Sequence, residues 1–188
     1  MSSGQLIVIT GPSGVGKGTL VRRLLEHYPN LHLSVSATTR PPRRNETEGQ
    51  DYYFVTQKLF QQMIQENKLL EWAEFAGNCY GTPRFAVEEK LKQNISVLLE
   101  IEIEGAKQIK QTFPNAFRIF ILPPSFTELE HRLRQRETES ETAILRRLER
   151  AKEEIALKEE FDRQIINDDL ETALAELIKE IDSILKKE

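Results

Sequence analysis

The stretch GPSGVGKGTL, residues 11–20, decides the fold of this chain. It follows the apolar run QLIVIT (5–10) and precedes a helix-compatible segment, which is the context that a phosphate-binding loop requires. The glycines let successive backbone N–H groups converge on one anion, and the helix expected to begin near Lys17 adds unpaired N–H groups and the positive end of its dipole. Lys17 supplies a mobile cation for the outer phosphates. The predicted phosphate contacts are Gly11, Pro12, Ser13, Gly14, Val15, Gly16, Lys17, Gly18 and Thr19.

The residue after Lys17 departs from the commonest form of this loop. A Ser or Thr hydroxyl that would bind Mg²⁺ is expected there, but the chain has Gly18, and the hydroxyl comes one position later, at Thr19. Because Mg²⁺ gives up its water reluctantly, we expect nucleotide oxygens and water to hold it, with Thr19 as a candidate ligand. The Gly-Lys-Gly-Thr ending is typical of nucleoside monophosphate kinases.

The rest of the chain repeats a strand–helix rhythm. Short apolar runs at 5–10, 96–103 and 117–122 are each followed by helix-compatible sequence, which predicts an α/β fold with a parallel sheet flanked by helices. RQIIN (163–167) and HLSVS (32–36) are further strand candidates. The apolar spacing over 169–188 predicts a closing helix.

Two intervals interrupt this rhythm. Residues 37–85 are aromatic and turn-rich, with strand candidates DYYFV and LLEWAEF around one short helix, and residues 125–159 predict two charged helices with a break near RETESE. We therefore expect a single domain, 1–188, whose parts are a core of 1–36, 86–124 and 160–188, a small mixed insertion over 37–85, and a short helical lid over 125–159.

Composition excludes several classes of protein. The formal charge of -4 argues against a nucleic-acid partner, which usually requires a basic face. No run approaches the roughly 18 apolar residues of a membrane span, and neither a signal peptide nor an anchor is visible. The single cysteine, Cys79, rules out an internal disulfide framework and fits a reducing cytoplasm. A monomer and a homo-oligomer are equally compatible with this composition.

Four further segments complete the pattern in order. They are SVSATTRPPRRNETEGQDYYF (34–54), EWAEFAGNCYGT (71–82), FILPPS (120–125) and IINDD (165–169). With the phosphate loop, they resemble the guanylate kinase family nearly end to end. The resemblance implies phosphorylation of GMP, and of dGMP, to the diphosphate in purine nucleotide metabolism, with ATP as donor, Mg²⁺ as cofactor and a cytoplasmic location.

The arginine-rich segment has the chemistry of a phosphate site. Arg40 and Arg43 lie three apart, on either side of Pro41 and Pro42, and with the hydroxyl of Tyr52 can form a bidentate cradle for a phosphate dianion. Tyr80 can add a second hydroxyl. The resemblance implies that these positions hold the phosphate of GMP.

Glu71 is predicted to recognise the base of the acceptor nucleotide, and is called the base reader. Guanine presents two adjacent donors, N1–H and the N2 amine, which one carboxylate can accept, whereas adenine presents N1 as an acceptor and would leave a buried charge unpaired. The resemblance implies further guanine-side contacts from Ser36, Gly81 and Thr82.

Acidic residues recur with period two in the second half of the run at 96–103 and directly after it. If the strand continues, Glu100, Glu102 and Glu104 share one face at the sheet edge where ligands bind. Family members usually carry Asp-x-Asp at 100–102. The resemblance implies that Glu102 contacts the guanine side and that Glu100 lies near the phosphates and metal, as a second candidate ligand.

The charged helices carry the expected lid. Arginines on a mobile segment can reach the transferred phosphoryl group only on closure, which also expels water. The resemblance implies that Arg132, Arg136 and Arg147 approach the ATP phosphates and that Asn167 lies near adenine. Lys17, Arg43, Arg136 and Arg147 are the predicted catalytic residues. Glu137 stands where the family usually has glycine, so the hinge motion of the lid is expected to differ in this chain.

Two alternative functions remain open at this point. A guanylate-kinase-like interaction module would typically lose parts of the phosphate loop, which is intact here. A related kinase for another phosphorylated acceptor, such as a ribose bisphosphate, is disfavoured by Glu71 and the turn at 80–82.

Overall fold

The computed structural model describes residues 4–75, 77–135 and 140–185. Arg136 and Glu137 therefore lie outside the described residues. The chain divides into two compact units: the first comprises Met1–Ile7 with Asn30–Ala116, and the second Val8–Pro29 with Phe117–Glu188, each taken over its described residues.

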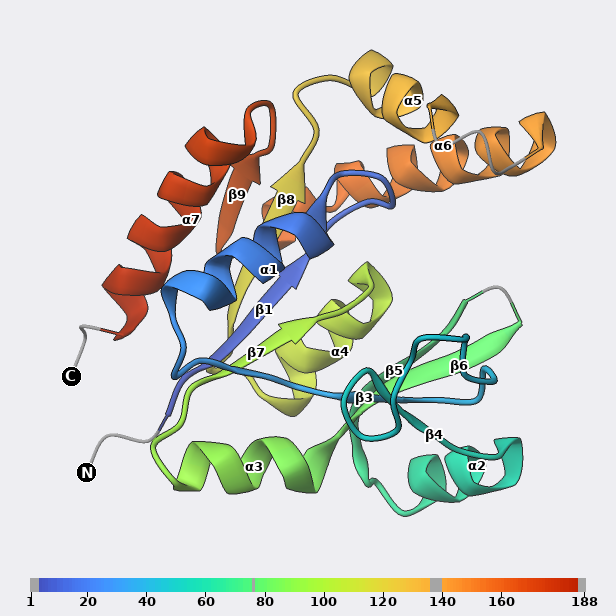
Figure 1. Cartoon of the computed structure of the whole chain (residues 1–188), viewed down its shortest axis with the longest axis vertical. Helices are drawn as coiled ribbons and strands as arrows, with labels where there is room; N and C mark the ends of the chain where they lie inside the picture. Colours follow the sequence, from blue (N-terminus) through green and yellow to red (C-terminus); the bar gives the residue numbers. More distant parts are fainter. Residues whose placement is uncertain (1–3, 76, 136–139, 186–188) are drawn as a thin grey trace. The chain divides into compact units, whose positions relative to one another are not determined.

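The first unit contains part of a parallel sheet and a second, mixed sheet (Figure 1). Its elements are the start of β1 (Leu6–Thr10), β2 (His32–Leu33), β3 (Ser36–Thr38), β4 (Tyr52–Phe54), α2 (Gln57–Gln65), β5 (Leu69–Phe75), β6 (Asn78–Pro83), α3 (Arg84–Lys92), β7 (Val97–Glu100) and α4 (Ile103–Thr112). In the parallel part, β2, β7 and β1 are neighbours in that order, and β2 pairs with β7 in parallel.

The mixed sheet has the order β4-β3-β6-β5. β3 and β6, like β5 and β6, pair antiparallel, while β3 and β4 pair in parallel. Its core is the buried group Ala37, Phe60, Leu69 and Cys79, against which α2 packs Met63 and Ile64. These elements confirm the strand candidates DYYFV and LLEWAEF and the short helix between them.

Helix α4 is attached to β5, the edge strand of this mixed sheet. The Gln108 side-chain amide accepts from the Trp72 N–H at 3.0 Å and donates to the Trp72 carbonyl at 2.6 Å. One turn further on, the Thr112 hydroxyl donates to the Leu70 carbonyl at 2.9 Å. The helix thus satisfies edge backbone groups that would otherwise be open and fixes the strand on both sides of Glu71.

The second unit contains the end of β1 followed in the sheet by β8 and β9. Its other elements are α1 (Lys17–His27), β8 (Phe117–Leu122), α5 (Phe126–Arg134), α6 (Glu141–Ala156), the 3₁₀ turn η1 (Lys158–Glu160), β9 (Arg163–Ile166) and α7 (Leu170–Leu185). β8 and β9 pair in parallel. Helices α1 and α7 lie side by side in Figure 1, joined by a 2.6 Å hydrogen bond from the Tyr28 hydroxyl to Asp182.

Helices α5 and α6 form the predicted charged pair and have a small core of their own, made of Leu129, Leu133, Ile144, Leu148 and Ala151. Asp169 accepts from the backbone N–H of Thr172 at 2.9 Å, so it caps α7 as a helix-start residue should. The parallel sheet, its flanking helices and the mixed insertion sheet confirm the predicted fold class.

Two predicted strands are wrong in extent. β7 ends at Glu100 rather than continuing to residue 103, because Glu102 already has N-cap geometry and Glu104 lies in the first turn of α4, where an acidic side chain favours the helix dipole. Glu100, Glu102 and Glu104 therefore do not share one strand face. The candidate strand at 32–36 is divided between β2 and β3, which belong to different sheets.

Candidate nucleotide-binding sites

The phosphate loop, Gly11–Lys17, connects β1 to α1 as predicted. Its glycines allow two close approaches by neighbouring side chains. Gly14, at φ +89°, is so close to α5 that a Cβ there would lie 2.7 Å from Leu133 Cδ2, and Gly16, at φ +93°, leaves room for the amide of Asn167. A side chain at either position would be strained as well as crowded.

Lys17 lies across its own loop. The ammonium donates to the Gly11 carbonyl at 2.5 Å and approaches the Pro12 carbonyl at 3.5 Å. Thr19, two residues into α1, is exposed. A positive charge is thus held beside a glycine-rich loop that leads into a helix N-terminus, which is an arrangement suited to a polyphosphate.

Asn167 and Arg132 brace this loop from outside. The buried Asn167 amide donates to the Val15 carbonyl at 2.8 Å, and Arg132 Nη1 donates to the Asn167 carbonyl at 2.9 Å. Arg132 also bonds Glu128 at 2.9 Å, one turn earlier on α5. The structure therefore brings Asn167 to the backbone of the phosphate loop, and Arg132 to the backbone of Asn167.

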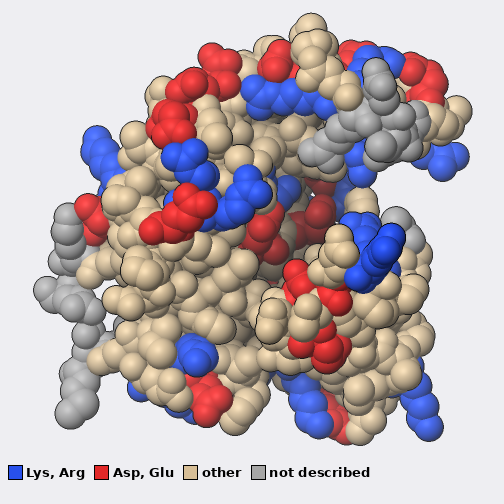
Figure 2. All heavy atoms as spheres, viewed as in Figure 1, with Lys and Arg blue, Asp and Glu red and all other residues tan. Residues whose placement is uncertain are grey.

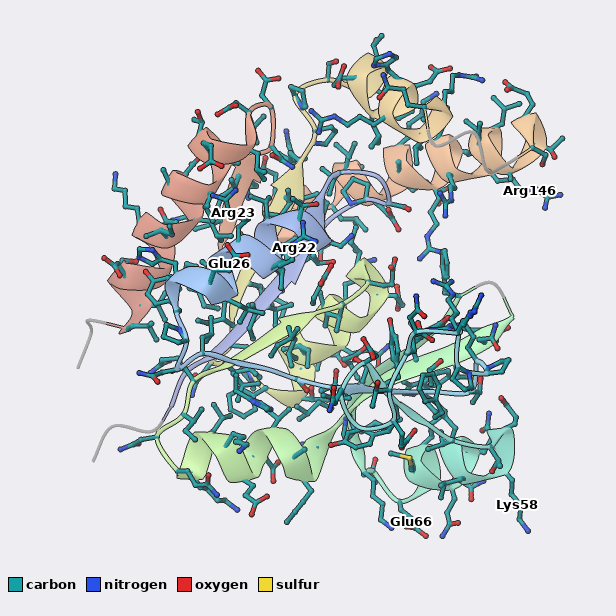
Figure 3. The ribbon with its side chains drawn as sticks, in the orientation of Figure 1. Arg22, Arg23, Glu26, Lys58, Glu66 and Arg146 are labelled. Atoms are coloured by element: carbon teal, nitrogen blue, oxygen red, sulfur yellow. The ribbon has the colours of Figure 1, made fainter. Side chains whose placement is uncertain are left out.

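The remaining lid arginines differ in their surroundings. Arg147 is half-buried on α6, whereas Arg146 is exposed and Figure 3 shows its side chain pointing away from the helix. Arg134 forks onto Glu141 at 2.5 and 2.8 Å and bonds Glu130, so it joins the ends of α5 and α6. Arg136 is outside the described residues.

In the first unit, a cationic cluster forms around Arg40. Its guanidinium forks onto the carboxylate of Glu46 at 2.9 and 2.7 Å and lies over the rings of Tyr52, at 5.3 Å, and Phe54, at 5.9 Å. The rings of Tyr52 and Tyr80 meet edge to face with centroids 6.1 Å apart. Burial raises the pKa of Tyr52, and its neighbour Tyr80 adds to the shift, so Tyr52 stays a neutral donor. Three predicted phosphate contacts are thereby brought together.

Glu46 is a residue of this cluster that the sequence reasoning missed. Besides the Arg40 fork it accepts the backbone N–H of Arg43 at 2.7 Å, and its pKa is held below the usual range by Arg40 first and by Arg43 second. It therefore fixes one arginine side chain and the backbone of the other, while the Arg43 side chain is exposed. The signal was a carboxylate three residues after Arg43 in a loop otherwise rich in arginine.

Glu71 is buried in the same unit, with 4% of its surface exposed. One carboxylate oxygen accepts from the Thr82 hydroxyl at 2.6 Å across the β5–β6 pair. Burial raises the pKa of Glu71 to about 7, Glu102 adds to the rise, and the hydrogen bonds from Thr82 oppose it. The carboxylate is therefore buried and held by Thr82, the other residue predicted to lie on the guanine side.

The other predicted contacts belong to different elements of the same unit. Ser36 begins β3, Gly81 pairs with Ala37 in β6, Glu100 is exposed at the end of β7, and Glu102 is half-buried at the start of α4. Of these, Glu102 acts on the Glu71 carboxylate through its charge, which raises the pKa of Glu71.

A metal site made of protein alone is absent among the described residues. No group of three or more His, Cys, Asp or Glu there is arranged to hold an ion. Thr19 and Glu100, the two predicted candidate ligands, are both exposed and belong to different units. In the part of the chain that is described, no helix is both long and apolar enough to cross a membrane.

On the face shown in Figure 2, Asp and Glu side chains lie among Lys and Arg side chains.

A glycine-rich loop between a parallel strand and a helix, with a lysine over it, defines an α/β nucleotide-binding protein of the phosphate-loop class. The family model for guanylate kinase matches residues 3–184. The chain belongs to the guanylate kinase family.

Several relatives agree with this assignment. A guanylate kinase of Synechocystis sp. is 63% identical over 176 residues, covering 94% of this chain and 92% of that protein. One of Thermosynechococcus vestitus is 61% identical over 174 residues, covering 93% and 91%. Among solved structures, guanylate kinase from Anaplasma phagocytophilum superposes with a TM-score of 0.78 at 34% identity, covering all of this chain and 89% of that one.

Proposed function

We propose that this protein is an ATP:GMP phosphotransferase that converts ATP and GMP, and also dGMP, to ADP and the corresponding diphosphate in the cytoplasm, where a free cysteine such as Cys79 is stable. The first unit would bind the acceptor and the second the donor. Within them, residues 37–85 would act as the GMP-binding insertion and residues 125–159 as the lid.

The observation that carries the proposal is the buried carboxylate of Glu71 in the same unit as the Arg40 cluster. A buried carboxylate of raised pKa is costly to ionise unless a ligand supplies donors. The N1–H and N2 amine of guanine supply two, and an acidic ligand such as a monophosphate then suits the cationic cluster. Adenine would place an acceptor against the carboxylate, and a mismatch of this kind can cost about 10⁴-fold in kcat/KM.

The transfer itself needs positioning and positive charge more than covalent help. An oxygen of the GMP phosphate attacks the γ-phosphorus of ATP, and the bond to the β,γ-bridging oxygen breaks, so that ADP leaves with that electron pair. The attacking oxygen is already ionised at neutral pH, so no general base is required. We assign Lys17, Arg43, Arg136 and Arg147 to the charge that spreads over the transferred group.

Mg²⁺ is the proposed cofactor. Bound to the ATP phosphates, it would neutralise charge on them, and Thr19 and Glu100 are the candidate protein ligands. The family uses ATP as donor and generally requires a divalent metal, which fits a chain whose described residues offer no metal cage.

The test is a coupled assay of ADP release with ATP and a panel of GMP, dGMP, AMP and IMP. We expect turnover with GMP and dGMP and a loss of at least about 100-fold in kcat when Lys17 is replaced by Met, since a transition-state cation is removed. Arg22→Met, a cation exposed on the same helix (Figure 3), is the matched control and should keep full activity. Absence of ADP release with every monophosphate would contradict the proposal.

A further inference from the structure

Gly105 lies in the first turn of α4, directly against the carboxylate of Glu71. A Cβ built on Gly105 would overlap Glu71 Oε2 and would lie 2.9 Å from its Cδ and 3.4 Å from its Cγ. The first two distances are shorter than a Cβ atom can adopt, and the third is an ordinary van der Waals contact, so no methyl group fits beside the carboxylate as it stands. The absence of a side chain at residue 105 is what leaves this volume to Glu71.

The backbone of Gly105 gives no reason of its own for a glycine. It is not among the described residues with positive φ, and it lies within the helix Ile103–Thr112, where alanine is favoured over glycine. A glycine here lowers helix stability, so its justification is the steric one.

Helix α4 and strand β5 cannot easily move apart to admit a side chain at residue 105. Gln108 is bonded to both backbone groups of Trp72, and Thr112 to the carbonyl of Leu70, which are the residues on either side of Glu71. Gly105, Gln108 and Thr112 follow one another at spacings of three and four, so they share one face of α4. The strand is therefore fixed at two points, and the side chain of Glu71 is the part that would have to give way.

We propose that Gly105 is a specificity-determining residue, because the space it leaves holds the Glu71 carboxylate in the position from which it reads the acceptor base. Gly105 acts through Glu71 and is a positioning residue rather than a catalytic one. The inference rests on the proposed function in one respect, the assignment of Glu71 to guanine; the steric relation between the two residues stands independently of it.

A double-mutant cycle separates these two parts. The proteins are the wild type, Gly105→Ala, Glu71→Ala and the double variant, with Glu71→Ser in place of Glu71→Ala if the latter does not fold. Glu104→Ala is the matched control, because Glu104 is an exposed neighbour in the same turn. Each protein is measured for KM of GMP, KM of ATP, kcat and thermal unfolding temperature.

In the wild-type background, Gly105→Ala should lower kcat/KM for GMP by about tenfold or more through KM, because the carboxylate is displaced from its donors. KM for ATP should stay within about twofold of the wild type, and Glu104→Ala should change neither constant. In the background lacking the Glu71 side chain, Gly105→Ala should change kcat/KM by less than about twofold.

Unfolding temperatures test the same contact without any activity. Gly105→Ala should lower the Tm in the wild type and raise it by about 2–4 °C in the background lacking Glu71, where only the helix preference remains. If the wild type fails to phosphorylate GMP, the proposed function is wrong. The opposite signs of the Tm change in the two backgrounds then still test the steric contact between Gly105 and Glu71. Equal effects of Gly105→Ala in both backgrounds, on Tm or on kcat/KM, would overturn the inference.

Discussion

Burial of the Glu71 carboxyl group disfavours its ionised form, which is the form that would accept hydrogen bonds from guanine in the proposed function. Burial raises its pKa to about 7 from an ordinary value near 4.5, so the unliganded folded protein binds this proton more tightly than the unfolded chain does. Stability contributed by the protonated form is fully present below about pH 4.5 and is lost as pH rises through about 7.

Glu71→Gln should remove this dependence. Relative to that variant, the wild type should lose about 2–3 kcal/mol of unfolding free energy between pH 5 and pH 8, since a tenfold difference in proton affinity between the folded and unfolded chain is worth about 1.4 kcal/mol. Urea unfolding of both proteins at the two pH values measures it, and the difference between them cancels the other carboxylates. A constant difference across this range would show that Glu71 ionises normally.

Glu46 is the second residue whose role the geometry defines. Glu46 accepts two hydrogen bonds from the Arg40 guanidinium and one from the backbone N–H of Arg43. These bonds predict that Glu46 orders the phosphate cradle before the acceptor arrives. Glu46→Gln should raise KM for GMP by about tenfold with a smaller change in kcat, because pre-organisation is lost while the cations remain.

Glu48→Gln is the control for that substitution. Glu48 lies in the same loop and also accepts a backbone N–H, that of Phe54 at 2.9 Å, but it bonds no arginine in the cradle. Steady-state kinetics of the two variants should therefore diverge. Similar KM values for GMP would mean that Glu46 serves only the loop.

At the scale of elements, α6 presents two adjacent arginines in contrasting settings. Arg147 is half-buried and Arg146 is exposed and points outward (Figure 3). If α6 delivers a cation to the transferred phosphoryl group, Arg147→Ala should lower kcat by about 100-fold or more, whereas Arg146→Ala should change it by less than about twofold. Single-turnover phosphorylation measures both, and matching losses would remove the assignment of Arg147.

The junction of β7 and α4 shows how an element boundary changes a site. A strand reaching residue 103 would have aligned three glutamates on one face, but Glu102 takes N-cap geometry and the helix begins immediately after it. The same early start brings Gly105 against Glu71. The position of the helix start thus determines which acidic residue lies where, which a period-two pattern alone could not indicate.

At the scale of the whole molecule, the predicted acceptor residues belong to the first unit and the described donor residues to the second. Each nucleotide should therefore protect its own unit. In hydrogen exchange, GMP alone should slow the exchange of amides around β5 and β6, and a non-hydrolysable ATP analogue that of amides in α1 and α5. At a ligand concentration 100 times Kd, the free energy of opening of these amides should rise by up to about 2.7 kcal/mol. Lys17→Met should abolish the second effect and leave the first. Protection of both units by either ligand alone would contradict separate binding.

The sequence by itself determined the strand–loop–helix of the phosphate loop, the parallel sheet, the mixed insertion sheet and the candidate set around Arg40 and Glu71. These follow from local patterns: apolar runs, glycine spacing and the order of family motifs. The tertiary structure alone decided the contacts that join residues far apart in the chain, such as Asn167 to Val15 and Gly105 to Glu71. It also decided that Glu46, which is local in sequence, forks onto Arg40. Burial and side-chain contact arise when distant segments pack together, and neither has a signature in residue spacing.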